Sequence, residues 1–448
     1  MGLLERMERQ RTGQNDIEQE NIRPASRRHN EHENIKGKIH QKVIDEINKR
    51  DIAIKSGEIS NEIYSIIEAT VAAEAEDINI IERMKISEEM LDDIVGYGPL
   101  EVLLKDPSIS EIMVNGPDKI YIERKGEIIR SDIVFRDDEH VMNIIDRIVS
   151  SVGRRIDESS PMVDARLADG SRVNVIIPPL SLSGPVITIR KFSSTPIKAE
   201  QLLDFGSLSR KMIAFLEACV KGKLNIIVSG GTGSGKTTLL NALSSFIPNN
   251  ERIITIEDAA ELQLLQEHVI TLESRPANLE NKGQITIRQL VINALRMRPD
   301  RIIVGEVRSS ETMDMLQAMN TGHDGSLTTI HANSPRDSLS RIETMILMNG
   351  MELPLKAIRE QISSAIDIIV QQARLRDGTR KVVNISEING MEGDTVIMQD
   401  IFKYETSGDI DSGGRFKGRF ISTGVHPRCA EKISGNGVAV NSDWFRND

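Results

Sequence analysis

The stretch LNIIVSGGTGSGKTTLL, residues 224–240, decides the fold of the second half of this 448-residue chain. Its apolar beginning, residues 224–228, predicts a strand, and leucines at helical spacing up to Leu243 predict a helix after it. Between them, GGTGSGKT has the spacing G-x-x-x-x-G-K-[ST] of a phosphate-binding loop. Glycines let the backbone turn tightly enough for successive N–H groups to point at one anion, and the start of a helix adds its own N–H groups. The stretch therefore predicts a strand, a phosphate loop and a helix.

The same stretch predicts which residues hold a nucleoside triphosphate. Lys236 is expected to neutralise the β- and γ-phosphates, and the Thr237 hydroxyl to bind Mg²⁺. At ordinary residue frequencies, a chance match is expected on the order of 0.01–0.02 times in a chain this long. The predicted nucleotide-binding residues are Gly230, Gly231, Thr232, Gly233, Ser234, Gly235, Lys236, Thr237 and Thr238.

Composition narrows the class of protein. A net charge of −11 and an aromatic content of 3% argue against a dominant nucleic-acid surface, which needs basic charge and stacking platforms. The two cysteines, Cys219 and Cys429, are far apart in sequence, which argues against a disulfide framework or a Cys-x-x-Cys zinc site and favours a reducing cytoplasm. No run approaches the 18 or so apolar residues of a membrane-spanning helix.

A chain this long predicts two or three domains. Apolar residues at helical spacing, such as Ile39, Val43 and Ile47, predict a small helical module. Alternating strands joined by turns follow, and from about residue 207 strands alternate with helices, which is typical of a mostly parallel sheet covered on both faces. The predicted segments are a mobile polar arm at 1–34, the helical module at 35–95, an α+β domain at 96–195, an α/β domain at 205–390 and an appended tail at 391–448.

Three further strands of the predicted parallel sheet end in residues that could take part in ATP hydrolysis. RIIVGE at 301–306 ends in Glu306, which could orient or deprotonate an attacking water. IITIED at 253–258 ends in Glu257 and Asp258, which could position Mg²⁺ or a second water. LTTIH ends in His331, a candidate γ-phosphate sensor, with His323 before the same strand. Ligands bind at the carboxyl ends of parallel strands, so these side chains are expected to converge on the loop.

Several segments resemble the type II/type IV secretion ATPase superfamily, most closely the CpaF/TadA-type ATPases of Tad (Flp) pilus systems. The long stretch at 296–345, which contains TGHDGSLTTIHAN, is similar to the family's histidine box, and IEDAAELQL at 256–264 to its aspartate box. The tetracysteine zinc module of many pilus-extension ATPases is missing, which favours the Tad group. The remaining matching segments are GYGPLEVLLKDPSISEIMVNG at 96–116, DARLADGSRVN at 164–174, SGPVITIRKF at 183–192 and the phosphate loop.

The resemblance implies a homo-hexameric, ATP- and Mg²⁺-dependent motor, cytoplasmic and peripheral at the inner membrane. In such proteins an α+β N-terminal domain is hinged to a RecA-like ATPase domain, and hydrolysis drives an inner-membrane platform that adds pilins to a filament or removes them. Nucleic acid is not an expected partner. By motif, the resemblance implies that Glu306 is the catalytic acid, that Glu257 and Asp258 form the aspartate box, and that His331 belongs to the histidine box. It also makes Arg166, Arg172 and Arg190 candidates to reach the phosphates.

Three alternatives stay open at this point. One is a motor for type IV secretion or conjugation, in the same superfamily. The second is a nucleic-acid translocase on the same core, which would show DNA-stimulated turnover with a steep salt dependence. The third is a scaffold that binds ATP only as a switch, against which the apparently complete site around Glu306 argues.

Overall fold

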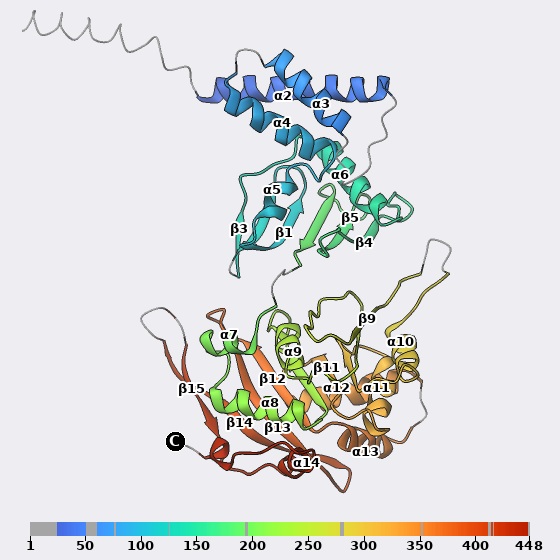
Figure 1. Ribbon diagram of the computed structural model, residues 1–448, viewed down its shortest axis with the longest axis vertical. Coiled ribbons are helices and arrows are strands. Elements are labelled where there is room, and N and C mark those ends of the chain that lie inside the picture. The colour runs from blue at the N-terminus through green and yellow to red at the C-terminus, as the bar shows by residue number, and fades with distance from the viewer. Residues whose placement is uncertain are drawn as a thin grey trace, which may run out of the picture. The chain divides into compact units, whose positions relative to one another are not determined.

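The computed structural model forms two compact units, residues 1–192 and 193–448, which are described separately below (Figure 1). Among the helices of the described residues, none is both long and apolar enough to cross a membrane. The described residues are 25–50, 61–75, 78–124, 126–192, 196–277, 282–350, 353–410, 414 and 416–446, with side chains from residue 35 onward.

The first unit begins with three helices, α2 (Ala25–Lys49), α3 (Asn61–Glu74) and α4 (Ile80–Ile94). Their apolar stripes bury one another, and the stripe predicted on the first helix is fully buried, with Ile39 at 0% exposure. Of the arm predicted at 1–34, residues 1–24 lie outside the described residues, and residues 25–34 form the start of α2.

An antiparallel sheet follows in the same unit, in the order β3-β2-β1-β6-β5-β4, and it packs against α6 (Asp138–Ser151). In the two central strands, β1 and β6, the side chains alternate between the core and the other face of the sheet. In β6, for example, Ile187 and Ile189 are fully buried whereas Arg190 is exposed, as the period-two pattern predicts. The remaining bounds are α5 Leu100–Lys105, β1 Ile109–Asn115, β2 Ile120–Arg124, β3 Glu127–Arg130, β4 Met162–Arg166, β5 Arg172–Ile176 and β6 Val186–Arg190.

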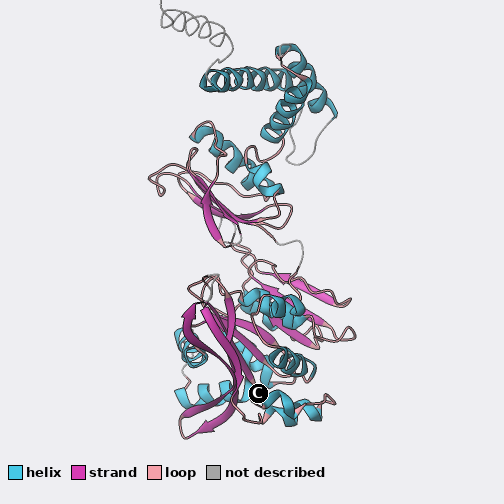
Figure 2. Ribbon diagram, turned by 90° about the vertical axis from the view of Figure 1, so that its left-hand side faces the viewer, coloured by secondary structure: helices cyan, strands magenta, loops and turns pink. Residues whose placement is uncertain are grey.

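The second unit is a nine-stranded sheet with helices on both faces (Figure 2). The strand β7 (Ile226–Gly230) lies near its centre, and its side chains alternate between two cores. Ile226 and Val228 pack with α8 and α9, whereas Ile227 packs with the group α10 to α13. A strand that is apolar on both faces is typical of a covered parallel sheet. The helix bounds are α7 Ala199–Asp204, α8 Arg210–Lys221, α9 Lys236–Ser244, α10 Ile287–Ala294, α11 Glu311–Asn320, α12 Pro335–Met348 and α13 Leu355–Ala365.

Six neighbouring strands of this sheet, β9-β8-β10-β11-β7-β12, are parallel, and their carboxyl ends therefore share one edge, here called the carboxyl edge. The predicted α/β class is confirmed, with a RecA-like parallel sheet preceded by an α+β domain and a helical module. The bounds are β8 Ile253–Glu257, β9 Val269–Glu273, β10 Arg301–Val304, β11 Leu327–His331 and β12 Ile368–Arg374.

The segment predicted as an appended tail, residues 391–448, contributes strands to this same sheet. β13 (Arg380–Glu392) pairs antiparallel with β12, and β14 (Thr395–Ile410) and β15 (Phe416–Ser422) continue outward. The chain then forms α14 (Cys429–Gly435) and η1 (Ser442–Phe445). Phe445 meets Phe215 of α8 and Phe402 of β14, with ring centroids 5.5 and 6.1 Å away, so the end of the described chain completes one of the two cores.

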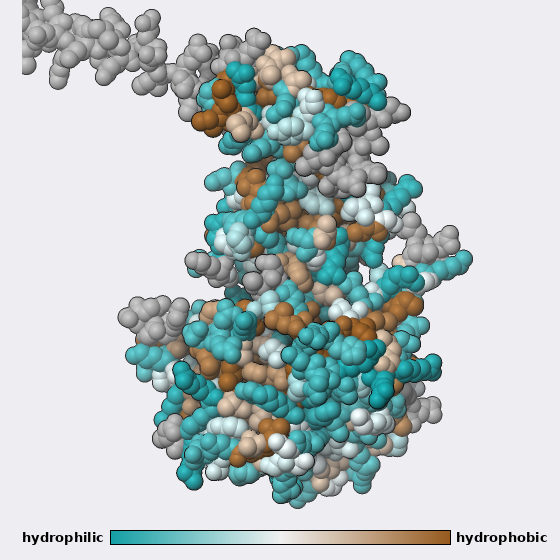
Figure 3. Space-filling model, in the orientation of Figure 1, coloured by the Kyte–Doolittle hydropathy of each residue, from teal (hydrophilic) through white to brown (hydrophobic). Residues whose placement is uncertain are grey.

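The face of the molecule in Figure 3 is largely hydrophilic, with apolar residues interspersed. Large apolar side chains that are exposed include Ile80, Ile81 and Met84 in the first turns of α4. All three lie within five residues of one helix, so they are neighbours along the chain.

Candidate functional site

The phosphate loop has the backbone geometry that its sequence predicts. Gly233 and Gly235 have φ values of +68° and +94°, in the left-handed region that favours glycine. α9 begins directly after Gly235, so its first N–H groups face the loop. Ser234 Oγ and Lys236 Nζ both donate to the carbonyl oxygen of Gly231, at 2.9 and 3.0 Å. The lysine ammonium is therefore folded over the loop, where a phosphate group would be bound.

The strand order brings the other predicted residues to the same carboxyl edge. β11 lies directly beside β7, and His331 is the register partner of Gly230. β10 lies on the other side of β11. The segment after β10 is still hydrogen-bonded to β11, because the N–H of Val307 donates to the carbonyl oxygen of Thr329 at 3.0 Å. Glu306 therefore follows a strand that is separated from the loop strand β7 only by β11.

At this edge Glu306, Arg308 and Asp258 form a small network of charged side chains. Its Oε2 lies 2.6 Å from Nη2 of Arg308, and Nη1 of Arg308 lies 3.6 Å from Oδ2 of Asp258. The hydrogen bond from Arg308 to Glu306 raises the pKa of the Arg308 guanidinium, although partial burial opposes this. The side chain of Glu306 is 25% exposed, so it can reach solvent and a substrate water. Sequence reasoning missed Arg308, whose only signal is its position two residues after the predicted acid.

Glu257 differs from Glu306 because it is buried, at 4% exposure. Its Oε1 accepts the backbone N–H groups of Glu261 and Leu262, at 3.0 and 3.2 Å, and so holds the segment after β8 in place. A Cβ at Gly305 would lie 2.8 Å from Cγ of Glu257. This explains why the position before Glu306 is glycine here: an aspartate there would collide with Glu257.

Asp258 lies beyond Glu257 and is exposed, and Ser274 Oγ donates to it at 3.0 Å. No group of three or more His, Cys, Asp or Glu side chains that could hold a metal occurs among the described residues. A nucleotide-bound Mg²⁺ needs fewer protein ligands, because phosphates and water fill most of its octahedron. The oxygen donors of Thr237, Glu257 and Asp258 are of the type that Mg²⁺ prefers, so the donor set fits; their assignment as ligands stays a prediction.

His331 and His323 lie at opposite ends of β11, so the structure does not bring them together. His331 is at the carboxyl edge, whereas His323 precedes the strand and accompanies Ser326, whose Oγ donates to the His323 carbonyl at 2.8 Å. Burial lowers the pKa of His331, and the positive charges of Lys236 and Arg341 lower it further, while Glu306 opposes them. These causes place His331 within electrostatic reach of both the loop lysine and the predicted acid.

A bound polyphosphate should raise the pKa of His331, because it would offset the positive charge of Lys236. Without nucleotide, the lowered pKa means that the imidazole is neutral at pH 7. Its contribution to folding stability is then present above about pH 6.5 and is lost as the pH falls through the lowered value. NMR titration of the imidazole signals with and without ATP measures this, with His331→Asn identifying the resonance. An unchanged His331 titration in saturating ATP would place it away from the phosphates.

The three predicted arginines lie in the first unit and form one row across its sheet. Arg166 of β4 is opposite Arg172 of β5, which is opposite Arg190 of β6. Arg166 Nε donates to the carbonyl oxygen of Gly170 at 3.1 Å, and Arg190 Nε is 3.9 Å from Glu111. Cross-strand neighbours of like charge repel one another, so this row is suited to binding an anion.

Comparisons with known proteins cover both units. The family model described as "Type II/IV secretion system protein" matches residues 93–419. A Mycobacterium tuberculosis protein provisionally named for conjugal transfer is 36% identical over 307 residues, which are 67% of this chain and 87% of that protein. The type IV secretion system protein VirB11 of Brucella abortus is 33% identical over 318 residues, 65% of this chain and 87% of that protein. The crystal structure of the VirB11 ATPase of Brucella suis with sulphate is 31% identical, covering 64% of this chain and 94% of that one with a TM-score of 0.36.

Proposed function

We propose a motor function for this chain, which belongs to the type II/IV secretion system protein family. It is a homo-hexameric ATPase that powers a Tad-type type IV pilus. It hydrolyses ATP with Mg²⁺ in the cytoplasm, peripheral to the inner membrane, and drives a membrane platform that assembles or retracts the filament. The assembly, location and platform come from the sequence resemblance of the phosphate loop and the stretch at 296–345.

One observation carries the enzymatic part of the proposal. A phosphate loop and a partly exposed glutamate lie at the same edge of one sheet, with one strand, β11, between the strands that they follow. Phosphoryl transfer needs positioning and charge more than covalent chemistry. The loop N–H groups and Lys236 would hold the phosphates, and Glu306 would orient the attacking water and accept its proton. Bound Mg²⁺ would neutralise charge on the phosphate oxygens, held through Thr237 and the Glu257–Asp258 pair.

The type IV secretion or conjugation motor is kept as a second candidate, because the named relatives favour it. Both the Mycobacterium tuberculosis protein and the Brucella abortus protein carry such names and are matched over most of their length. The family match begins at residue 93, so all of the helical module α2 to α4 except the last two residues of α4 lies outside it. A difference between pilus and secretion motors could therefore reside in that module, which is where a comparison of the two subclasses should begin.

Lys236→Ala should abolish or strongly weaken nucleotide binding, because the phosphates lose their fixed cation. Loss of a charged hydrogen bond predicts a fall in ATP affinity of about tenfold or more. Titration with a fluorescent ATP analogue, beside a steady-state phosphate-release assay, measures binding and turnover. Wild-type affinity in the variant would remove the loop from the proposed site.

The same variant separates the two candidate functions in the cell. A chromosomal Lys236→Ala strain should lose surface pili if the Tad proposal is right. Loss of conjugal transfer or of protein secretion, with pili intact, would support the second candidate. Turnover that rises with added DNA would instead favour a nucleic-acid translocase.

A further inference from the structure

The hairpin that joins β12 to β13 lies against the phosphate loop. Nε of Arg380, the first residue of β13, donates to the carbonyl oxygen of Gly233 at 3.0 Å. A Cβ at Gly235 would lie 3.2 Å from Cδ of Arg380 and 3.3 Å from Nε2 of Gln372. A Cβ at Gly233 would lie 3.7 Å from Nη1 of Arg374, the last residue of β12. Two guanidinium groups from one hairpin therefore border two glycines of the loop.

The two arginines share one face of the hairpin, because Arg374 and Arg380 are register partners. Both are exposed. The register therefore places two positive charges directly opposite each other, and an anion that lies between or beside them would interact favourably with both. The nearest structural feature built for an anion is the phosphate loop itself, where backbone N–H groups and the start of α9 converge.

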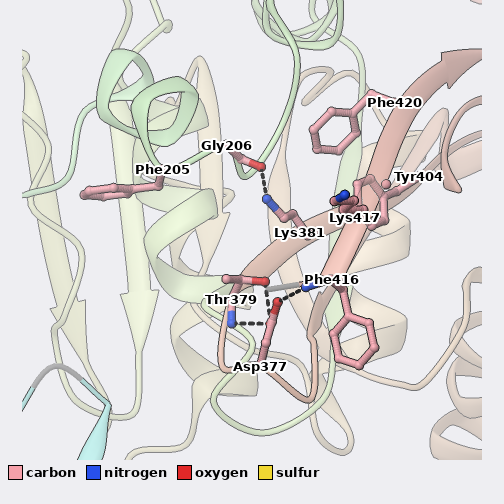
Figure 4. A pocket seen from close by; sticks show the side chains of 10 residues that line it. Phe205, Gly206, Asp377, Thr379, Lys381, Tyr404, Phe416, Lys417 and Phe420 are labelled. Carbon is pink, nitrogen blue, oxygen red and sulfur yellow. Dashed lines mark hydrogen bonds between the residues drawn. The ribbon is translucent and has the colours of Figure 1, made fainter. Parts of the chain in front are cut away.

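The turn of the hairpin is fastened to its surroundings (Figure 4). Oδ1 of Asp377 accepts the backbone N–H and the hydroxyl of Thr379, at 2.9 and 2.7 Å, and Oδ2 accepts the N–H of Phe416 in β15, at 2.8 Å. On the next residue after Arg380, Nζ of Lys381 donates to the carbonyl oxygen of Gly206, at 2.6 Å. The arginines therefore project from a hairpin whose position is fixed from both sides.

We propose that Arg374 and Arg380 bind the phosphate groups of the nucleotide from within the second unit. The inference rests on the proposed function, since it assigns additional residues to the same nucleotide site. A guanidinium carries five N–H donors in a planar fork suited to phosphate oxygens. Nε of Arg380 donates to Gly233, so its Nη groups are the donors that would meet a phosphate. The ligand class is a di- or triphosphate chain, recognised by charge.

The test uses the full chain and inorganic tripolyphosphate, which competes with a fluorescent ATP analogue and has no base or sugar. Arg374→Ala and Arg380→Ala should each weaken tripolyphosphate competition about tenfold or more, as loss of a charged hydrogen bond predicts. Arg376→Ala is the matched control, because it removes the same charge from the turn of the same hairpin and should leave affinity within about twofold. Thermal melting of all variants shows that they are folded.

Arg380→Gln separates phosphate binding by Arg380 from a purely structural role through its hydrogen bond to Gly233. Glutamine can still donate to a carbonyl oxygen but has no charge, so binding should fall as it does with alanine. Binding restored by glutamine would overturn the proposal for Arg380, and wild-type affinity in both alanine variants would overturn it entirely. Because Lys236→Ala reports on the loop independently, weakened binding there with intact binding in the hairpin variants would reject the hairpin and keep the ATPase assignment.

Discussion

Replacing Glu306 by glutamine is expected to leave ATP bound and to lower turnover by about 10²-fold or more. Glutamine has nearly the same shape and can still accept the hydrogen bond of Arg308, which is 2.6 Å long in the native site. The loop contacts do not involve this side chain, so affinity should be kept. What is lost is a basic carboxylate that can orient the attacking water and take its proton. Single-turnover phosphate release beside an equilibrium binding titration measures the two effects separately.

Two controls make the Glu306 result specific. Glu273→Gln removes a carboxylate from the end of β9, at the far side of the same carboxyl edge, and should hydrolyse ATP at the wild-type rate. Arg308→Ala keeps the carboxylate but removes its partner. Because glutamine can still accept the hydrogen bond of Arg308, a Glu306 that acts only by anchoring Arg308 predicts lost activity in Arg308→Ala but not in Glu306→Gln. Near-wild-type hydrolysis by Glu306→Gln would show that another group is the catalytic base.

The carboxyl edge of the second sheet was largely predictable, for a simple geometric reason. In a parallel sheet all strands end at the same edge, so a short apolar run followed by a polar residue already places that residue near its neighbours. Gly230, Glu306 and His331 were located in this way, and the strand order now places Gly230 and His331 at the ends of the adjacent strands β7 and β11, and Glu306 just after the next strand, β10. The prediction needed only the direction of each strand, which the alternation with helices provides.

Residues that reach the site by long-range pairing could not be predicted. Arg380 contacts Gly233 only because β12 returns beside β7 and then turns back as β13. The sequence of the hairpin indicates a turn, through Asp377 and Gly378, but not which strand it lies beside. For the same reason, residues 391–448 were predicted as a separate element. An antiparallel strand added at a sheet edge carries no sequence mark of its partner.

Two details were set by packing that no local pattern reports. Glycine at position 305 is explained by the buried Glu257, whose Cγ leaves no room for a side chain there. His323 and His331 are close in sequence, but His323 precedes the five-residue strand β11 and His331 is its last residue, so only His331 belongs to the carboxyl edge. Proximity along the chain was misleading here, because an extended strand places its first and last residues at opposite edges of the sheet.

The arginine row of the first unit carries the second large prediction. Arg190→Ala or Arg172→Ala should lower turnover of the full-length chain by about 10²-fold or more, in the range of losses seen for arginine fingers. The resemblance predicts that arginines of this domain reach the transferring phosphoryl group, which needs more positive charge than Lys236 supplies. A cation delivered by a second unit would also couple hydrolysis to motion, because its partner changes when phosphate leaves.

The register of β4, β5 and β6 places the three arginines opposite one another, and this arrangement defines the variants and the control to compare. Arg172 lies between Arg166 and Arg190 in the strand register, and Nε of Arg190 is 3.9 Å from Oε1 of Glu111. An arginine that is at least partly exposed contributes little to folding stability, so thermal melting should be unchanged. Arg130→Ala, on β3 at the far edge of the same sheet, is the matched control and should keep full activity. A row variant that melts and hydrolyses ATP as the wild type does would remove that arginine from the catalytic site.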